Sequence, residues 1–126
     1  MAYGDIGGPI TELILTCRTA ASGTVDIARG DAVKLTGPYE ITNDLDDDDP
    51  IFGQALANCN RNDAPLPVRV RGVCDFAFTG TTPTVDGVSG VVAADSTGVV
   101  KAEAGAAAHG LIVKVDTDAG IVETLL

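Results

Sequence analysis

One β-turn phrase occurs in both halves of the chain and decides the expected fold. The first copy reads VDIARGDAVKLTG (residues 25–37), and the second reads VDGVSGVVAADSTG (residues 85–98). Both have Val-Asp, a glycine five positions after the valine, a short β-prone run and a closing Thr-Gly. A strand that ends in a glycine-marked turn and re-enters the sheet is the unit of small barrels and sandwiches. We therefore expect the two copies to form matching rims of one small barrel.

Short apolar runs separated by turn signals extend along the rest of the chain. The expected strands cover residues 10–18, 33–35, 39–42, 51–57, 68–71, 74–78, 99–102, 111–115 and 121–125. No long segment has the 3.6-residue period of a helix, and the alanine-rich residues 103–108 have room for one helical turn at most. The pattern predicts an all-β protein, either a small β-barrel or a β-sandwich, with an extended N-terminal arm.

The arm is predicted from residues 1–9, in which glycine and other small residues predominate. In the strand that follows, Leu13, Leu15 and Cys17 have the spacing of one face, whereas Ile10 and Ile14 lie on the other. Apolar residues on both faces indicate a strand that is covered from both sides. We group the arm and this strand as residues 1–18 and expect residues 19–126 to form a single β-domain.

Composition and charge restrict the classes of partner. At 126 residues the chain has the size of one domain, and it contains no tryptophan, three phenylalanines and two tyrosines. So few aromatic residues predict a thin core, for which oligomerisation is a common remedy. The net charge of −10 disfavours a nucleic-acid partner, because the chain repels a phosphate backbone.

No targeting segment is expected. The apolar runs at residues 10–17 and 121–126 are too short to cross a bilayer, and the N-terminus lacks the features of a secretory signal. We therefore predict a soluble protein made in the cytosol, without a membrane partner. Cys17, Cys59 and Cys74 have no CxxC spacing, and in this compartment we expect reduced, largely buried thiols.

Motifs that would indicate catalysis are weak. A GxxxxGK[ST] phosphate-binding loop is absent from the sequence. His109 is the single histidine, and its neighbours give no sign of a nucleophilic pair with a cysteine. Lys101 faintly resembles the lysine of a swinging-arm carrier domain, but it lies in a β-prone run instead of at a hairpin tip. We expect no enzymatic activity and no cofactor.

An acidic loop, NDLDDDDP, covers residues 43–50. Asp44, Asp46 and Asp48 alternate like the first ligands of an EF-hand loop, but Asp49 stands where that loop needs glycine. Ala55 also replaces the glutamate that would complete the ligand set. We expect a solvated loop without a metal ion, and a weak divalent-cation site is the alternative.

Arg69 and Arg71 alternate with buried-type valines and project from one face of a predicted strand. One interpretation is a solvated strand face. The other is that the two arginines meet an acidic loop, their own or a neighbouring subunit's, with Asp46 and Asp48 as interface partners. Exposed ion pairs contribute only about 0–1 kcal/mol, so such contacts would set register and orientation.

Further phrases carry a family resemblance. They are IFGQAL at residues 51–56, VRVRGV at 68–73, a glycine-bounded strand around 85–100 and a closing hairpin at 111–125. With these, most of residues 23–126 resembles a family of small capsid decoration (cement) proteins of tailed bacteriophages, one often mislabelled as a phage recombinase. The missing phosphate loop and the acidic charge give no support to the recombinase label.

The resemblance implies a structural protein on the outer surface of an assembled icosahedral capsid, made in the host cytoplasm. Its partner would be the major capsid protein, and it would sit as a trimer at three-fold positions or as a dimer at two-fold positions. The arm and first strand would add to a sheet edge of the capsid subunit. The expected capsid-binding residues are Tyr3, Ile6, Ile10, Leu13 and Leu15. A receptor- or glycan-binding β-domain of a virion appendage is the alternative, which the shortage of aromatic residues disfavours.

Overall fold

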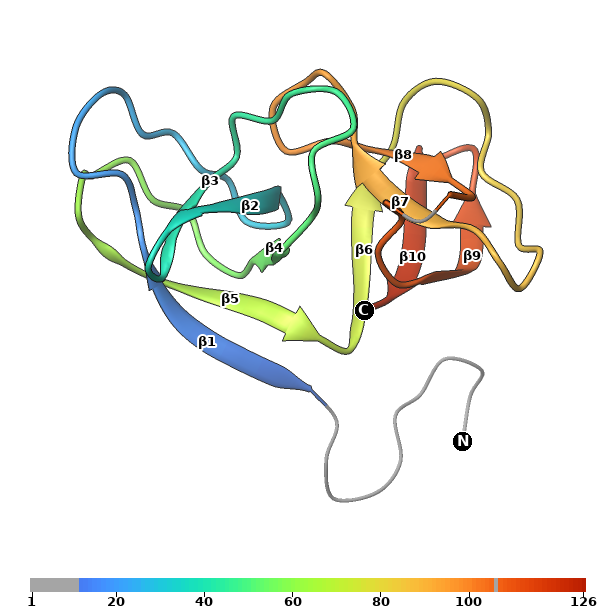
Figure 1. Ribbon diagram of the computed structural model, residues 1–126, viewed down its shortest axis with the longest axis horizontal. Coiled ribbons are helices and arrows are strands. Elements are labelled where there is room, and N and C mark those ends of the chain that lie inside the picture. Colours follow the sequence, from blue (N-terminus) through green and yellow to red (C-terminus); the bar gives the residue numbers. More distant parts are fainter. Residues whose placement is uncertain (1–11, 106) are drawn as a thin grey trace.

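The computed structural model describes residues 12–105 and 107–126, which form β-strands and no helix (Figure 1). The expected all-β class is confirmed. The strands are β1 (Leu13–Arg18), β2 (Ala32–Gly37), β3 (Glu40–Thr42), β4 (Gly53–Ala55), β5 (Pro65–Arg71), β6 (Val73–Ala77), β7 (Gly90–Ala93), β8 (Val100–Glu103), β9 (Leu111–Asp116) and β10 (Ile121–Leu125). No helix in this part of the chain is therefore long and apolar enough to cross a membrane.

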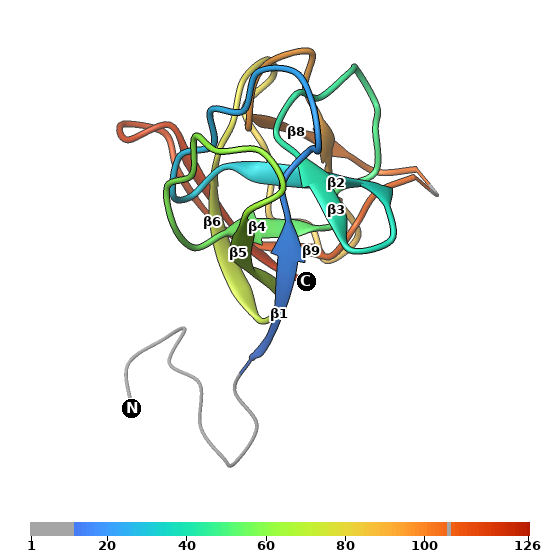
Figure 2. The ribbon, with the colours of Figure 1, turned by 90° about the vertical axis from the view of Figure 1, so that its left-hand side faces the viewer.

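The first five strands close into a barrel with the order β1-β3-β2-β4-β5 (Figure 2). β1 runs antiparallel to β5, and the barrel closes where β1 meets β3 in parallel at the pair Arg18 and Glu40. β1, which we had grouped with the arm, is thus a strand of the barrel. The side chains that fill the barrel are apolar: Cys17, Ile27, Val33, Ile41, Ala55, Leu66, Val68 and Val70.

The second half of the chain forms two smaller sheets beside the barrel (Figure 1). One has the order β6-β10-β9 and includes the predicted C-terminal hairpin, and the other pairs β7 with β8. Cys74 and Phe76 are buried between these sheets, and Phe78 packs against the same cluster, as their alternation predicts. Ala32 and Leu45 join this second core from the first half of the chain, so both halves contribute to it.

The two copies of the turn phrase adopt different structures. In the first copy Gly30 lies in a turn with φ of 96°, and the chain then enters β2 of the barrel. In the second copy Gly90 begins β7, where a Cβ would overlap the carbonyl oxygens of His109 and Gly110. The prediction of matching rims of one barrel is wrong. The shared spacing combines a glycine that a turn requires with a glycine that close packing requires.

Candidate binding surface

A shift of register between the start of β1 and the end of β5 brings several predicted residues together. Leu13 pairs with Arg71 and Ile14 pairs with Arg69, with a register shift between the two pairs. Directly opposed residues of an antiparallel pair project from the same face. Leu13 and Ile14 therefore both lie on the face of the two arginines, and they are 49% and 43% exposed. We call these four residues, Leu13, Ile14, Arg69 and Arg71, the ribbon face.

Leu15 lies on the opposite side of β1. It pairs with the fully buried Val68 and packs, partly buried, against the barrel core. The expected shared face of Leu13, Leu15 and Cys17 fails at Leu13, because the register shifts there: Val70 of β5 is an extra residue between the partners of Leu13 and Ile14. Of the expected capsid-binding residues, Leu13 is exposed and Leu15 contributes to the core. Three others, Tyr3, Ile6 and Ile10, lie outside the described residues.

The second edge of β1 is open over most of its length. Among the described residues, β1 pairs on that side with β3 only, and only at Arg18. Figures 1 and 2 show the N-terminal part of β1 extending beyond the barrel. The two exposed apolar side chains of the ribbon face lie on this part of the strand. An open strand edge of this kind is a template for a strand from another chain.

The two arginines of the ribbon face contact different groups from those expected. The Nε atom of Arg69 lies 2.6 Å from Oε2 of Glu12, and its Nη1 atom donates a hydrogen bond of 3.2 Å to Gln54 Oε1. Arg71 is exposed and donates to the carbonyl oxygen of Val70. The expectation that these arginines meet the acidic loop of their own chain is therefore wrong. A contact with a neighbouring subunit stays a prediction.

The acidic loop is instead fastened to its own chain by two lysines. Lys34 Nζ lies 2.6 Å from Asp49 and 3.6 Å from Asp46, and Lys101 Nζ lies 2.7 Å from Asp47 and 2.8 Å from Asp48. The hydrogen bonds that Lys101 donates to Asp47 and Asp48 raise its pKa. Asp46 and Asp48, proposed from the sequence as interface residues, thus have partners within the chain. Between residues 12 and 126, apart from residue 106, no group of three or more acidic, histidine or cysteine side chains is arranged to hold a metal ion.

The remaining reactive side chains are mostly buried. Cys17 and Cys74 are free and buried, and Cys59 is free and half-buried. Burial raises the pKa of Cys74 to about 11, against the nearby charge of Arg69, so this thiol stays protonated at neutral pH. Burial, together with the charge of Arg71, lowers the pKa of His109. Lys101 belongs to β8 and is engaged by the acidic loop, unlike the free lysine of a carrier domain.

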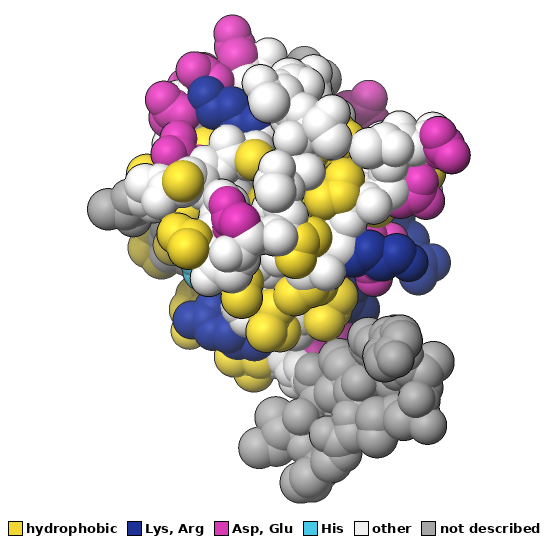
Figure 3. Space-filling view, turned by 90° about the vertical axis from the view of Figure 1, so that its right-hand side faces the viewer, with side chains coloured by type: hydrophobic (Ala, Val, Ile, Leu, Met, Phe, Trp, Pro, Cys, Tyr) yellow, Lys and Arg dark blue, Asp and Glu magenta, His cyan; other side chains and the backbone are white. Residues whose placement is uncertain are grey.

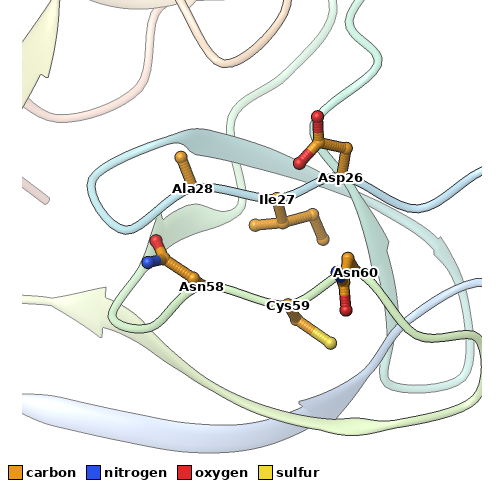
Figure 4. A pocket seen from close by; sticks show the side chains of 6 residues that line it. All are labelled: Asp26, Ile27, Ala28, Asn58, Cys59 and Asn60. Carbon is orange, nitrogen blue, oxygen red and sulfur yellow. The ribbon is translucent and has the colours of Figure 1, made fainter.

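A polar hollow of about 420 Å³ lies between two facing segments, residues 26–28 and 58–60 (Figure 4). Ile27 and Cys59 hold these segments together through backbone hydrogen bonds of 2.8 and 2.9 Å. Asp26, Asn58 and Asn60 supply the polar lining, and no aromatic side chain takes part. No periodic pattern in the sequence indicates this hollow, because it depends on a bridge between two loops, at Ile27 and Cys59.

Hydrophobic side chains also gather on the half of the molecule that the two smaller sheets form. Figure 3 shows them on the face that lies at the right-hand side of Figure 1. The exposed apolar residues of this half of the chain are Val85, Val88, Val113 and Leu125, which we call the C-terminal apolar face. Exposed apolar groups that gather in this way mark sites of protein contact.

Comparison with known proteins gives no family. No family model matches the chain, and a search of curated proteins finds no match.

Proposed function

We propose that this chain is a structural virion protein that binds the outer surface of an assembled phage capsid and bridges neighbouring capsid subunits. The ribbon face is the observation that supports this function. There an open strand edge lies beside exposed Leu13 and Ile14, at the point where residues 1–11 join the barrel. The likeness of residues 23–126 to capsid decoration proteins agrees with this arrangement.

The proposed attachment uses the backbone of β1. A strand of the major capsid protein adds to the open edge through main-chain hydrogen bonds, and the two apolar side chains pack against it. Several copies acting together multiply modest contacts through their effective concentration. The protein stabilises the shell because it binds the assembled form and not the separated subunits.

We further propose that the protein acts as a homotrimer, with a dimer as the alternative. The chain has few aromatic side chains to fill a core, and it exposes the C-terminal apolar face. Both features favour association of several copies. Leu125 pairs with Val73, two residues after the Arg71 that pairs with Leu13, so this subunit contact would lie near the ribbon face. The native mass from multi-angle light scattering measures the number of copies.

The test is attachment to capsids after substitution of the ribbon face. We expect the double variant Leu13→Asp, Ile14→Asp to co-sediment with assembled capsids at least about tenfold more weakly than the unaltered chain. Removal of residues 1–9 should weaken attachment in the same way. Leu13 and Ile14 are exposed, so the circular dichroism spectrum and the Tm of the double variant should change little.

The matched control is the double variant Leu35→Asp, Tyr39→Asp, since these side chains are also exposed but lie on the β2–β3 hairpin. It should bind capsids like the unaltered chain. Equal losses in the two double variants, or full binding by the ribbon-face variant, would contradict the proposal.

Glycan binding is a second candidate, because the hollow of Figure 4 presents a carboxylate and two amides. Such groups suit sugar hydroxyls, although the stacking platform that sugars commonly use is missing there. Titration of glycans with NMR detection of the Asn58 and Asn60 side-chain amides tests this candidate. Saturable changes in the chemical shifts of both side-chain amides would favour glycan binding over capsid attachment.

A further inference from the structure

A second hollow, of about 280 Å³, lies between the barrel and β6 and has two arginines in its wall. Arg69 enters it from β5, and Arg29 enters it from the turn before β2. Gln54 of β4 and Asp75 of β6 complete the polar lining. We call it the arginine hollow.

Gln54 fixes the position of the Arg69 guanidinium. This glutamine is only 3% exposed, and its Nε2 atom donates to the carbonyl oxygens of Gly30 and Asp75, at 3.2 and 2.6 Å. With both amide hydrogens engaged, its Oε1 atom must face the arginine, from which it accepts a hydrogen bond. Glu12 holds the Nε side of the same guanidinium.

Arg69 still has donors for a ligand. A guanidinium has five N–H groups, and the hydrogen bonds to Glu12 and Gln54 use two of them. The Arg69 side chain is 23% exposed, so the group is accessible from the hollow although its orientation is fixed. Such preorganisation reduces the entropy that binding has to overcome.

Arg29 supplies a second positive charge at the rim. Five of the eight basic residues form ion pairs with acids of the described chain, and Arg29 is not among them: the five are Arg18, Lys34, Arg69, Lys101 and Lys114. The backbone of Arg29 is nevertheless held in place, since its N–H donates to Asn58 Oδ1 at 2.7 Å. In a chain of net charge −10, an exposed arginine with no acidic partner in that part of the chain suits an acidic group from outside.

The chemistry of the hollow favours a carboxylate. A planar carboxylate matches the fork of a guanidinium and accepts two parallel hydrogen bonds. Asp75 and the acidic surface repel a phosphate dianion or a nucleic-acid backbone more strongly than a single carboxylate.

The position of the hollow indicates where that carboxylate comes from. Arg69 is directly opposite Ile14 on the ribbon face, so the hollow adjoins the proposed capsid-binding surface. We propose that the arginine hollow receives an aspartate or glutamate side chain of the capsid subunit, which fixes the register of attachment. This proposal rests on the proposed function and names the partner chemistry of the same surface.

The test compares Arg29→Glu with Arg61→Glu in capsid co-sedimentation. Arg61 is also exposed and has no ion pair among the described residues, but it lies outside the hollow, so the two variants change the net charge equally. We expect Arg29→Glu to weaken attachment at least about tenfold and Arg61→Glu about twofold or less. The salt dependence of attachment should also become shallower in the Arg29→Ala variant. Equal effects of the two glutamate variants would overturn the proposal, since they would reflect net charge alone.

A peptide experiment tests carboxylate binding by the hollow independently of capsid attachment. A short glutamate-containing peptide, with its glutamine counterpart as control, is titrated into the full chain and followed by NMR at the Gln54 side-chain amide. Binding of the glutamate peptide that Arg29→Glu abolishes supports the hollow even if the chain does not sediment with capsids. Equal binding of both peptides, or tighter binding of inorganic phosphate, would overturn it. A change of native mass in Arg29→Glu would also overturn it, because the acidic group would then belong to a second copy.

Discussion

Gly53 and Gln54 are neighbours in β4 and together control how β4 meets β5. A Cβ on Gly53 would overlap the carbonyl oxygen of Arg69 and press against Val68. The absence of a side chain thus permits the close approach that brings Gln54 within hydrogen-bonding distance of Arg69. At the scale of single residues, strand spacing and arginine orientation depend on the same dipeptide.

Gly53→Ala should therefore destabilise the fold by about 1–3 kcal/mol, because the added methyl group meets backbone that cannot rotate away. Gly37→Ala is the control, since a Cβ there makes an ordinary contact of 3.6 Å with Glu40 and should change stability by about 0.5 kcal/mol or less. Urea unfolding monitored by circular dichroism measures both. Equal stability of the two variants would show that β4 and β5 can separate at low cost.

At the scale of elements, the acidic loop joins parts of the molecule that the sheets leave separate. Lys34 belongs to β2 of the barrel, and Lys101 belongs to β8 of the two-stranded sheet. The backbone supports the same connection, because Asp48 donates to the carbonyl of Ala93 and Ala93 donates to that of Asp49. The loop is therefore a strap between the barrel and the β7–β8 sheet.

Acid should weaken this strap. The hydrogen bond from Lys34, aided by the backbone N–H of Asp46, lowers the pKa of Asp49. The stability that this carboxylate contributes is complete above its unfolded pKa, near 3.9, and is lost as the pH falls through the lower folded pKa. We expect Asp49→Asn to have a lower Tm than the unaltered chain at pH 7, and the difference to shrink below about pH 4.

Melting curves from pH 7 to pH 3 measure this difference. Asp118→Asn is the control, because this exposed residue forms no ion pair within the described chain. Its Tm should follow that of the unaltered chain at every pH. A constant difference for Asp49→Asn over the whole range would mean that the effect of the substitution does not come from the charge of Asp49.

The same elements indicate how far the sequence predicts the fold. The valines and arginines of β5 alternate without interruption, so their faces are predicted correctly. Where β1 pairs with β5, Val70 is an extra residue of β5 without a partner in β1. This shift leaves no mark in the pattern of β1, so Leu13 is assigned to the wrong face. The turn phrase misleads because one spacing serves both a turn glycine and a packing glycine.

The candidate site is predicted only in part, for a related reason. Leu13 and the two arginines are identified from the alternation of their own strands. Gln54 and Arg29 are not, because a single polar residue has no periodicity and its role depends on contacts distant in the chain. The lysines that bind the acidic loop are missed on the same ground.

At the scale of the whole molecule, the two halves should unfold together. Ala32 donates to the carbonyl of Gly98, Gly98 donates to that of Asn43, and the second core contains side chains from both halves. Phe76→Ala should cost about 3–5 kcal/mol and lower the Tm of a single calorimetric transition. In the Phe76→Ala variant, the backbone amide hydrogens of β5 in the barrel should also exchange faster than in the unaltered chain.

Leu35→Ala, at an exposed position of the β2–β3 hairpin, serves as the control and should leave the Tm of the transition unchanged. Two separate transitions, or unchanged protection of β5 in Phe76→Ala, would mean that the barrel folds independently of the second core.

The pairing of β1 with β5 also affects how the chain folds during translation. Glu12 and Arg69 are 57 positions apart, so the N-terminal strand leaves the ribosome long before its partner. Closing so large a loop is entropically costly, and contacts of this separation form slowly. β1 is synthesised before every other described strand, yet it is among the last to be paired. Until β5 emerges, the nascent chain presents Leu13 and Ile14 on a strand with two open edges, a period in which a chaperone would recognise it.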